Sequence, residues 1–486
     1  MPIPRVCIVA PEFIGPFPNG GVGTACYWEA CTLGRTGHDV TVLYTGPTER
    51  ETPEHWEAHF PGHAPFRYVD LARHAPAGNP DWSRFDFPCS EAHTAELVLA
   101  WLGGQHFDLV LFQEFLGHGA RALQARRSGN VLNGARAATT LHSCRQWIYE
   151  GMRRLPARPS DVAVDFLEKE SARLADRIVA PSRHMADWAA ARWRLESRAA
   201  VIPYCYDETL SRPRSVVEHA GPFRHLVFFG RLETRKGLHL FCRALANTPE
   251  LGEHVERVTF LGKPSTVEGL PSEEFIASHM ATMPSVQWEV LGTLGSFEAQ
   301  AWLASQEHAL VVAPSIVDNL PYAVIELQTR RIPFISTSIG GIPEIVGAAN
   351  AHVLAAPTDT SLASTMLRVC RDGVLVVDYR SGYDVSAANQ AHVDFVRRML
   401  AEPAPVAPPS RTSDPFDVVV TNVEDDDALA RVRARAVNVD RSMKDARWMR
   451  LDSWRSCKDR APALFLDAGV EIGSHLSERL LRAMHC

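Results

Sequence analysis

The segment Pro314-Ser-Ile-Val-Asp-Asn-Leu-Pro-Tyr-Ala-Val-Ile-Glu-Leu-Gln328 carries the pattern that decides the fold. It follows Ala309-Leu-Val-Val-Ala313, a short apolar run typical of a buried strand. Pro321 suits the first turn of a helix, because its missing N–H costs nothing there. The chain then continues through Pro333-Phe-Ile-Ser-Thr-Ser-Ile-Gly-Gly-Ile-Pro-Glu-Ile-Val346. Together these residues predict a strand, a loop, a helix, a second strand, a Gly-rich turn and a second helix.

Two carboxylates lie around the first of these helices. Glu326 stands inside an apolar run, where a carboxylate is rarely buried without a partner. Asp318 lies in the preceding loop, eight positions earlier. Carboxylates accept hydrogen bonds from sugar hydroxyls, and a helix N-terminus offers N–H groups to an anion. The segment could therefore hold a polyhydroxylated, phosphorylated ligand; the alternative is that Glu326 faces solvent and Asp318 caps a helix.

Length and composition limit the class of protein. A chain of 486 residues is expected to form two or three domains. A net charge of -7 argues against nucleic acid or a membrane surface as the main partner. The ten cysteines contain no CxxC pair, so we expect neither a zinc site nor a disulfide framework. The N-terminus does not resemble a signal peptide and no apolar run is long enough to span a bilayer, so we expect a cytoplasmic protein.

The N-terminal part of the chain begins with a βαβ pattern. Residues 5–10 and 39–44 are predicted strands, and residues 24–37 a helix. Gly20-Gly-Val-Gly23 stands at the first junction between strand and helix, where glycines let a backbone approach a ligand and the helix start favours phosphate. The spacing is not GxGxxG, so it is weak evidence for a nicotinamide cofactor. A Gly-rich turn without a ligand remains possible.

Strands and helices continue to alternate after this unit. Further strands are predicted at residues 108–112, 137–142, 177–180 and 200–203, with helices at 165–176 and 184–194. This order predicts a parallel sheet covered by helices on both faces. His142 stands at the carboxyl end of its strand, the edge at which open α/β sheets bind ligands. A lone histidine is more often structural, and its position makes this one a candidate.

A second series begins near Pro222. Strands are predicted at residues 225–229, 257–261, 287–291, 309–313 and 333–337. The loop Gly230-Arg-Leu-Glu-Thr-Arg-Lys-Gly237 follows the first of them and carries Arg231 and Lys236. A guanidinium and an ammonium placed there can stabilise a diphosphate, although two surface cations are the simpler alternative. Two such domains leave a cleft between their sheet edges, where a ligand usually binds.

These patterns predict the organisation of the whole chain. We expect an N-terminal Rossmann-like domain at residues 1–210, a second at 211–385 and a helix at 386–401. A Pro-rich linker is expected at 402–410, before a small α/β segment at 411–486. The acidic run Glu424-Asp-Asp-Asp427 could suggest a metal site, but we favour a solvated loop that caps the next helix.

Residues 5–400 resemble the retaining nucleotide-sugar glycosyltransferases of family 4, which have the GT-B fold of two Rossmann-like domains facing across a cleft. The resemblance rests on the order and spacing of Gly20-Gly-Val-Gly23, Gly230 to Gly237, Asp318 to Glu326 and Gly340-Gly-Ile-Pro-Glu344. It implies that the helix at 386–401 packs on the N-terminal domain. The tail resembles, more faintly, a truncated family 2 glycosyltransferase of the GT-A type, through Leu464-Phe-Leu-Asp-Ala-Gly-Val-Glu471.

The resemblance also implies roles for individual residues. Gly20, Gly21 and Gly23 would approach the donor, and Arg231 and Lys236 would bind its diphosphate. Asp318 would contact the transferred sugar, the amides of Asn319 and Leu320 the sugar or phosphate, and Glu326 the ribose. His142 matches a histidine near the donor sugar. The residues proposed to act in catalysis are therefore His142, Asp318, Arg231 and Lys236. The family has Glu at the position of Asp318, so this chain departs from the pattern by one methylene.

The resemblance implies a hexosyl transfer from a UDP-, GDP- or ADP-sugar to a glycan, lipid-linked or small-molecule acceptor. No metal would be required, because Arg231, Lys236 and helix N-termini would neutralise the phosphates. Membrane contact would be peripheral at most, and the sequence leaves the oligomeric state open. The alternative is a nucleotide-sugar-binding or scaffold protein with little or no turnover. A GT-B-like epimerase or phosphorylase lacks support, since no lysine matches the pyridoxal phosphate lysine of phosphorylases.

Overall fold

The computed structural model describes most of the two predicted Rossmann-like domains and parts of the C-terminal segment. The described residues are 3–14, 20–46, 65–74, 90–195, 199–403, 417–421, 426–439, 447–450 and 463–467. Most of the predicted Pro-rich linker and part of the acidic run lie outside these residues. None of the helices in the described part of the chain combines the length and the apolar character needed to cross a membrane.

The N-terminal domain is built on a seven-stranded parallel sheet in the order β3-β2-β1-β4-β5-β6-β7. The strands are β1 (Arg5–Ala10), β2 (Asp39–Tyr44), β3 (Arg67–Asp70), β4 (Leu109–Gln113), β5 (Arg136–Thr140), β6 (Arg177–Ala180) and β7 (Ala200–Val201). The central strands are almost wholly buried, as expected for a parallel sheet covered by helices on both faces. The last predicted strand, residues 200–203, is shorter than expected, because β7 ends at Val201.

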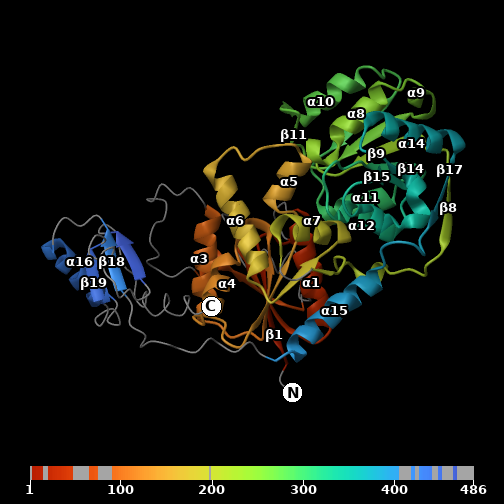
Figure 1. The fold of residues 1–486 in the computed structure, drawn as a ribbon. Helices are drawn as coiled ribbons and strands as arrows, with labels where there is room; N and C mark the ends of the chain where they lie inside the picture. Colours follow the sequence, from red (N-terminus) through yellow and green to blue (C-terminus); the bar gives the residue numbers. More distant parts are fainter. Residues whose placement is uncertain are drawn as a thin grey trace.

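Helices connect these strands and cover the sheet (Figure 1). They are α1 (Gly21–Arg35), α3 (Ser90–Gly103), α4 (Ala120–Arg127), α5 (Arg145–Gly151), α6 (Pro159–Arg173) and α7 (Arg183–Trp193), with 3-10 turns η1 (Leu71–Arg73), η3 (Phe115–Gly117) and η4 (Glu208–Leu210). Helix α6 begins six residues before the predicted start at residue 165. Pro159 occupies its first turn, and the Asp161 carboxylate accepts hydrogen bonds from the N–H groups of Ala157 and Arg158. These capping contacts set the earlier start.

The second domain contains a six-stranded parallel sheet in the order β13-β10-β9-β14-β15-β16. Its strands are β9 (His225–Phe229), β10 (Arg257–Leu261), β13 (Gln287–Leu291), β14 (Ala309–Ala313), β15 (Phe334–Thr337) and β16 (Leu354–Ala355). The helices are α8 (Leu238–Ala246), α9 (Leu251–His254), α10 (Ser272–Met280), α11 (Ser296–Ala304), α12 (Tyr322–Arg330), α13 (Ile342–Val346) and α14 (Asp359–Asp372), with 3-10 turns η5 (Thr234–Lys236) and η6 (Ala348–Val353).

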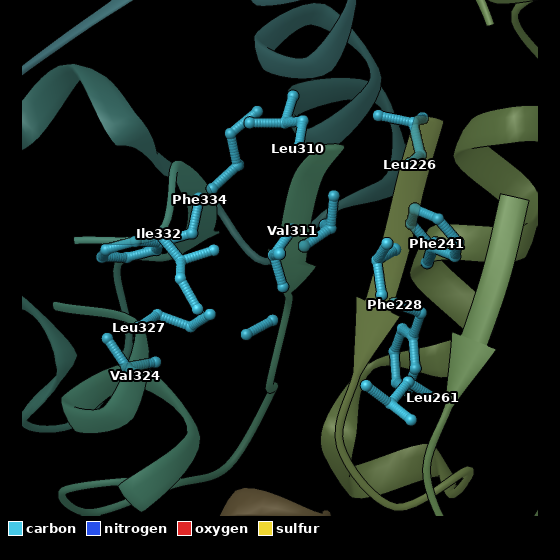
Figure 2. Packing of buried hydrophobic residues seen from close by; sticks show 14 of the residues in the cluster. Leu226, Phe228, Phe241, Leu261, Leu310, Val311, Val324, Leu327, Ile332 and Phe334 are labelled. Carbon is cyan, nitrogen blue, oxygen red and sulfur yellow. The ribbon is translucent and has the colours of Figure 1, made fainter. Parts of the chain in front are cut away.

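Two small pairs of antiparallel strands accompany the second domain. They are β8 (Val216–Ala220) with β17 (Val374–Asp378), and β11 (Thr266–Val267) with β12 (Leu270–Pro271). The core of this domain lies between the central strands and helices such as α8 and α12. Figure 2 shows Phe228 of β9 beside Phe241 of α8. In the same view Val311 of β14 lies between these two rings and the side chains of Leu327 and Ile332. Two doubly wound parallel domains of this kind form the predicted GT-B fold.

Helix α15 (Val385–Ala401) leaves the second domain and runs along the first (Figure 1). Its residues Val393 and Met399 share a buried cluster with Val6 and Ile8 of β1. His392 adds a polar contact, with Nδ1 3.2 Å from a Glu29 carboxylate oxygen of α1 and Nε2 3.0 Å from the carbonyl oxygen of Pro203. Burial opposes a charge on His392, but Cys205 and Glu29 raise its pKa well above the usual value.

The C-terminal segment contains a three-stranded parallel sheet in the order β19-β18-β20. Its elements are β18 (Asp417–Thr421), α16 (Asp426–Val439), β19 (Arg447–Arg450) and β20 (Ala463–Asp467). A small α/β segment was expected at residues 411–486, and the described strands and helix are of this mixed kind. Its relation to family 2 glycosyltransferases stays a prediction.

Candidate functional site

The carboxyl ends of strands from both sheets meet at a cavity of about 210 Å³. The segments after β1, β4 and β5 form the wall that belongs to the N-terminal domain. The segments after β9 and β14 form the wall that belongs to the second domain. The residues that line it are Glu12, Gly20, Gly21, Val22, Phe115, His142, Ser143, Ile148, Tyr204, Arg231, Arg235, Lys236, Asp318, Asn319, Leu320, Pro321 and Tyr322. The fold thus brings together Gly20, Gly21 and the other predicted site residues except Gly23 and Glu326, which do not line this cavity. Ligands of open α/β sheets bind at such an edge.

The glycine loop forms the part of the wall that precedes α1. Gly20 is the N-cap residue of this helix, and its N–H donates to a Glu12 carboxylate oxygen at 3.0 Å. A Cβ atom on Gly20 would lie 2.9 Å from the same carboxylate, so a larger residue would displace it. Gly23 is buried within α1, one turn further on. The loop therefore presents backbone and the start of a 15-residue helix to the cavity, which suits an anion.

His142 is buried and fully hydrogen-bonded. Its Nε2 lies 2.6 Å from Gln113 Oε1, and its Nδ1 lies 2.8 Å from the Tyr204 hydroxyl. An amide oxygen only accepts, so Nε2 carries the proton and Nδ1 accepts from Tyr204. Burial lowers the pKa of His142 to about 3. The ring is therefore neutral with both nitrogens occupied, and it can shape the cavity but has no free nitrogen for proton transfer.

Aromatic rings continue from His142 into the second domain. Tyr204 stacks on His142 with ring centroids 5.4 Å apart, and on Tyr322 with centroids 5.3 Å apart. The Tyr322 hydroxyl donates to the carbonyl oxygen of Cys205 at 2.8 Å. This column of three rings joins the two domains behind the cavity. Neither tyrosine was a predicted site residue, because no local pattern separates them from ordinary core tyrosines.

The basic loop after β9 supplies three cations. Arg231 is about half exposed and lies 3.2 Å from a Glu233 carboxylate oxygen. Arg235 lies 3.4 Å from the same oxygen. Lys236 is mostly buried, and its ammonium pairs directly with the Asp318 carboxylate. Burial lowers the pKa of Lys236, against the opposing effect of Asp318. Arg235 was missed as a candidate, although its charge and its place beside Lys236 were visible in the sequence.

Gly237 fixes the direction in which this loop leaves Lys236. Its φ is +78°, in the left-handed region that favours glycine. A Cβ atom there would lie 1.8 Å from the carbonyl oxygen of Pro314, at the end of β14. The loop after β9 and the loop after β14 therefore touch through backbone at this point. That contact brings Lys236 to Asp318.

Asp318 is buried at the centre of the site, with 8% of its surface exposed. Its carboxylate accepts from Lys236 and from the Ser315 hydroxyl at 3.1 Å, and Arg235 lies 3.9 Å away. Burial disfavours the charge, but Lys236 and Arg235 outweigh it and lower the pKa of Asp318. The N-cap of α12 is Pro321, so the alternative that Asp318 caps this helix is wrong.

Asn319 links the loop of Asp318 to the N-terminal domain. Its Nδ2 donates to the carbonyl oxygen of His142 at 2.6 Å, and its Oδ1 accepts from the hydroxyl of Ser182. Its own carbonyl oxygen accepts from the N–H of Gly341 at 2.6 Å. The neighbouring Gly340 has a φ of +55°, and a Cβ atom there would lie 1.7 Å from the carbonyl oxygen of Asp318. The Gly-Gly turn thus supports the loop from behind.

Glu326 lies on α12 with 6% of its surface exposed. Burial raises its pKa to about 8, although Arg330 and Gln300 lower it. The alternative that Glu326 faces solvent is therefore wrong. Its predicted contact with a ribose stays a prediction, because the residue does not line the cavity.

Two buried carboxylates that the sequence did not indicate hold the loop after His142. Glu114 accepts from the N–H of Ser143 at 2.7 Å, and Glu168 accepts from the N–H of Arg145 at 2.6 Å. Burial raises the pKa of Glu114 to about 8 and that of Glu168 well above its usual value. Glu168 also accepts from the N–H of Leu116 at 3.1 Å. These contacts fix the backbone that positions His142.

The charges around the cavity match a ligand that carries two linked phosphates. Arg231, Arg235 and Lys236 stand on one loop, and the N-terminus of α1 faces them across the cavity. Asp318 and the Asn319 amide lie beyond the cations and can bind hydroxyl groups. Within the described ranges, no group of three or more His, Cys, Asp or Glu side chains is placed to hold a metal ion.

Comparisons with known proteins agree with this geometry. Residues 19–210 match the family described as Glycosyltransferase Family 4, and residues 223–372 match Glycosyl transferases group 1. No curated protein matches the chain in sequence.

Solved structures share the fold at low sequence identity. A TarM mutant of S. aureus, solved with Fondaparinux, alpha-GlcNAc-glycerol and UDP, has a TM-score of 0.56 and 8% identity over 82% of this chain and 100% of its own. An alpha,alpha-trehalose-phosphate synthase (UDP-forming) from Burkholderia vietnamiensis has a TM-score of 0.50 and 13% identity over 82% of this chain and 98% of its own. A glycosyltransferase from Rickettsia africae has a TM-score of 0.50 and 12% identity over 82% of this chain and 99% of its own. The fold is GT-B, and the two family matches support a glycosyltransferase of family 4 type.

Proposed function

We propose that this chain transfers a hexosyl group from a nucleotide diphosphate sugar to an acceptor hydroxyl, with retention of the anomeric configuration. The observation that carries the proposal is the cluster of Lys236, Arg235 and Arg231 facing the start of α1 across a cavity that also contains Asp318. The donor diphosphate would bind between these cations and the start of α1. Its negative charge grows as the sugar leaves, so the cations stabilise the transition state more than the ground state.

The transferred sugar would lie towards Asp318 and Asn319. Asp318 offers a carboxylate to a sugar hydroxyl, and the amides of Asn319 and Leu320 offer donors. His142 forms part of the wall, and its occupied nitrogens exclude it as the group that removes the acceptor proton. Glu326 would reach the ribose from α12. In this arrangement the protein works mainly by positioning the two substrates and stabilising the leaving group.

The two carboxylates that line the cavity do not favour a covalent glycosyl intermediate as the route to the proposed retention. Asp318 is paired with Lys236, and Glu12 accepts from the N–H of Gly20, so neither is an unengaged nucleophile. The bond between the anomeric carbon and the diphosphate oxygen would break through an oxocarbenium-like transition state. The acceptor oxygen would bond to the same face, and its proton would pass to the departing diphosphate oxygen.

The reaction would proceed without a metal, since the three cations and the helix N-terminus neutralise the diphosphate. UDP is the first nucleotide to test, because the trehalose-phosphate synthase is described as UDP-forming and the TarM mutant was solved with UDP. The acceptor would be a glycan, lipid-linked or small molecule of polysaccharide biosynthesis, and a cytoplasmic location remains part of the proposal.

The alternative is a nucleotide-sugar-binding protein with little turnover. The observation that favours it is the Asp318–Lys236 pair, which engages both the sugar-binding carboxylate and a phosphate-binding cation.

The test is release of nucleotide from UDP-, GDP- and ADP-sugars, in the presence of EDTA, with and without mixed sugar acceptors. The proposal expects release from one donor class, a product with retained configuration by NMR, and loss of both in Lys236→Ala. Nucleotide binding without release from any donor would favour the alternative. If the protein neither binds nor releases nucleotide from any donor, both the proposal and the alternative are refuted.

A further inference from the structure

A second cavity, of about 360 Å³, shares Asp318 with the first. It is also formed by both domains: α5 and α7 supply one wall, and the loops after β14 and β15 supply the other. The volume falls within the range of roughly 300–1,000 Å³ that is typical of small-molecule sites. Asp318 lines both cavities, so a molecule in the second cavity is next to the proposed position of the transferred sugar.

Two indole rings dominate the wall of this cavity. Trp147 of α5 donates its Nε1–H to Nε2 of His184 at 3.3 Å, and Trp188 of α7 donates its Nε1–H to a Glu150 carboxylate oxygen at 2.9 Å. Both N–H groups are thus satisfied within the protein. What the indoles contribute to the cavity is therefore ring surface, whose electron-rich face attracts the weakly positive C–H groups of a sugar ring.

Polar groups for hydroxyls stand beside these rings. The Glu150 carboxylate is held by Trp188 and lies 3.3 Å from the Arg192 guanidinium on the adjoining turn of α7. Burial lowers the pKa of His184, so its ring is neutral at pH 7. Since its Nε2 accepts from Trp147, its proton is on Nδ1, which makes that nitrogen a donor. One acceptor and one donor next to apolar rings match the alternating C–H and O–H surfaces of a pyranose.

The charge of the cavity narrows the class of molecule. Its described lining contains two carboxylates, Glu150 and Asp318, and neither arginine nor lysine. Each carboxylate is already paired with a cation, Glu150 with Arg192 and Asp318 with Lys236, so a phosphorylated or otherwise anionic acceptor would find no unpaired arginine or lysine in this lining. The cations of the site lie in the first cavity instead.

We propose that this second cavity binds a sugar ring of a neutral saccharide acceptor. The inference rests on the proposed function and narrows its acceptor from glycans, lipid phosphates and small molecules to neutral glycans. Trp188 and Trp147 supply the stacking surface, and Glu150 and His184 bind hydroxyls. A hydroxyl of the same acceptor then reaches the donor sugar past Asp318.

The experiment measures binding of neutral and anionic probes to the full-length protein by saturation-transfer NMR and calorimetry. The probes are methyl glycosides of glucose, galactose and mannose, maltose, and glycerol 1-phosphate. Trp188→Ala and Glu150→Gln are compared with Trp288→Ala, a matched control on β13 whose side chain is exposed. Trp188→Phe covers the case in which Trp188→Ala does not fold, since Trp188 packs edge-on against Trp193.

We expect at least one neutral saccharide to bind, with a Kd raised at least tenfold by Trp188→Ala and about threefold by Glu150→Gln, and unchanged by Trp288→Ala. Glycerol 1-phosphate is expected not to compete. The inference would be overturned if neither Trp188→Ala nor Glu150→Gln changes the Kd for the saccharide, or if glycerol 1-phosphate competes with it. Binding of UDP, GDP or ADP is measured on the same samples: nucleotide binding without saccharide binding sinks only this inference, whereas no nucleotide binding counts against the proposed function as well.

Discussion

Replacing Asp318 by asparagine is expected to tighten nucleotide diphosphate binding while it slows sugar transfer. In the protein, the Asp318 carboxylate already occupies the Lys236 ammonium, and Arg235 lies 3.9 Å from it. A diphosphate that binds Lys236 therefore meets a carboxylate on the far side of the same ammonium. Asparagine removes that negative charge and keeps nearly the same shape.

The magnitude follows from the spacing of the charges. Two anions that share one ammonium are about 6 Å apart, since each N–H···O contact spans about 2.8 Å. At an effective dielectric constant of about 20, two unit charges at this distance repel by roughly 3 kcal/mol. Counter-ions and the loss of charge stabilisation for Lys236 reduce this gain, and we expect about 1–2 kcal/mol, or roughly 5- to 30-fold in Kd.

The assay is calorimetric titration with UDP, GDP and ADP at pH 6.5, because burial lowers the pKa of Lys236 and a lower pH favours its charged form. Lys236→Met is expected to weaken binding by about 2 kcal/mol, roughly 30-fold, because it removes a charge-assisted hydrogen bond. Lys169→Met on α6, outside both cavities, serves as the matched control. Sugar transfer by Asp318→Asn should fall at least tenfold. If Asp318→Asn weakens nucleotide binding as Lys236→Met does, the carboxylate positions the ammonium and does not compete for it, and the reasoning is refuted.

Three further predictions concern the frame of the site. The pKa of Glu114 is raised to about 8 from 4.5, so the folded protein holds this proton more tightly than the unfolded chain, and the contribution of Glu114 to stability should fall by about 2 kcal/mol from pH 6 to pH 8. Glu168 and Glu326, whose pKa values burial also raises, add to the slope. Glu114→Gln, followed by urea unfolding at both pH values, should reduce the loss of stability by the share of Glu114, and an unchanged slope would contradict the assignment. Gly237→Ala should lower the free energy of unfolding by more than about 3 kcal/mol. Gly373→Ala, at a glycine with a similar positive φ and open space around it, should lower it by about 1 kcal/mol. Equal losses of Tm in the two variants would show that the backbone clash at Gly237 is relieved. Asn319→Ala breaks a contact between the domains and should lower the free energy of unfolding by about 1–3 kcal/mol, which an unchanged urea midpoint would exclude.

The sequence predicted the parallel sheets and the basic loop because their signals are local. Buried parallel strands are continuous apolar runs, and the residues from Gly230 to Gly237 combine glycines and cations within one turn. The start of α6 was missed although its signal is also local. Its signal is a proline and a carboxylate that caps the preceding N–H groups, in a segment that contains no apolar stripe.

The parts of the site that were not predicted depend on contacts between distant segments. His142 was a candidate from its place at the end of β5, but its pKa is lowered by burial, and the partners of its two ring nitrogens, Gln113 and Tyr204, lie 29 and 62 positions away. Glu326 was noticed as a carboxylate in an apolar run, yet the spacing from Asp318 does not tell which face of α12 it occupies. Glu114 and Glu168 stand in ordinary amphipathic surroundings, and only the fold turns them towards the same loop.

The placement of charge on either side of Asp318 explains how one cleft can hold two substrates in order. The first cavity is lined by three cations, whereas the second is lined by indoles and by carboxylates that are already paired. In the proposed reaction, a nucleotide sugar would therefore bind with its phosphates on the basic loop and its sugar towards Asp318. Asp318, held by Lys236, stands at the boundary between the two cavities because it lines both. In the proposed reaction, that boundary is where the acceptor hydroxyl meets the anomeric carbon.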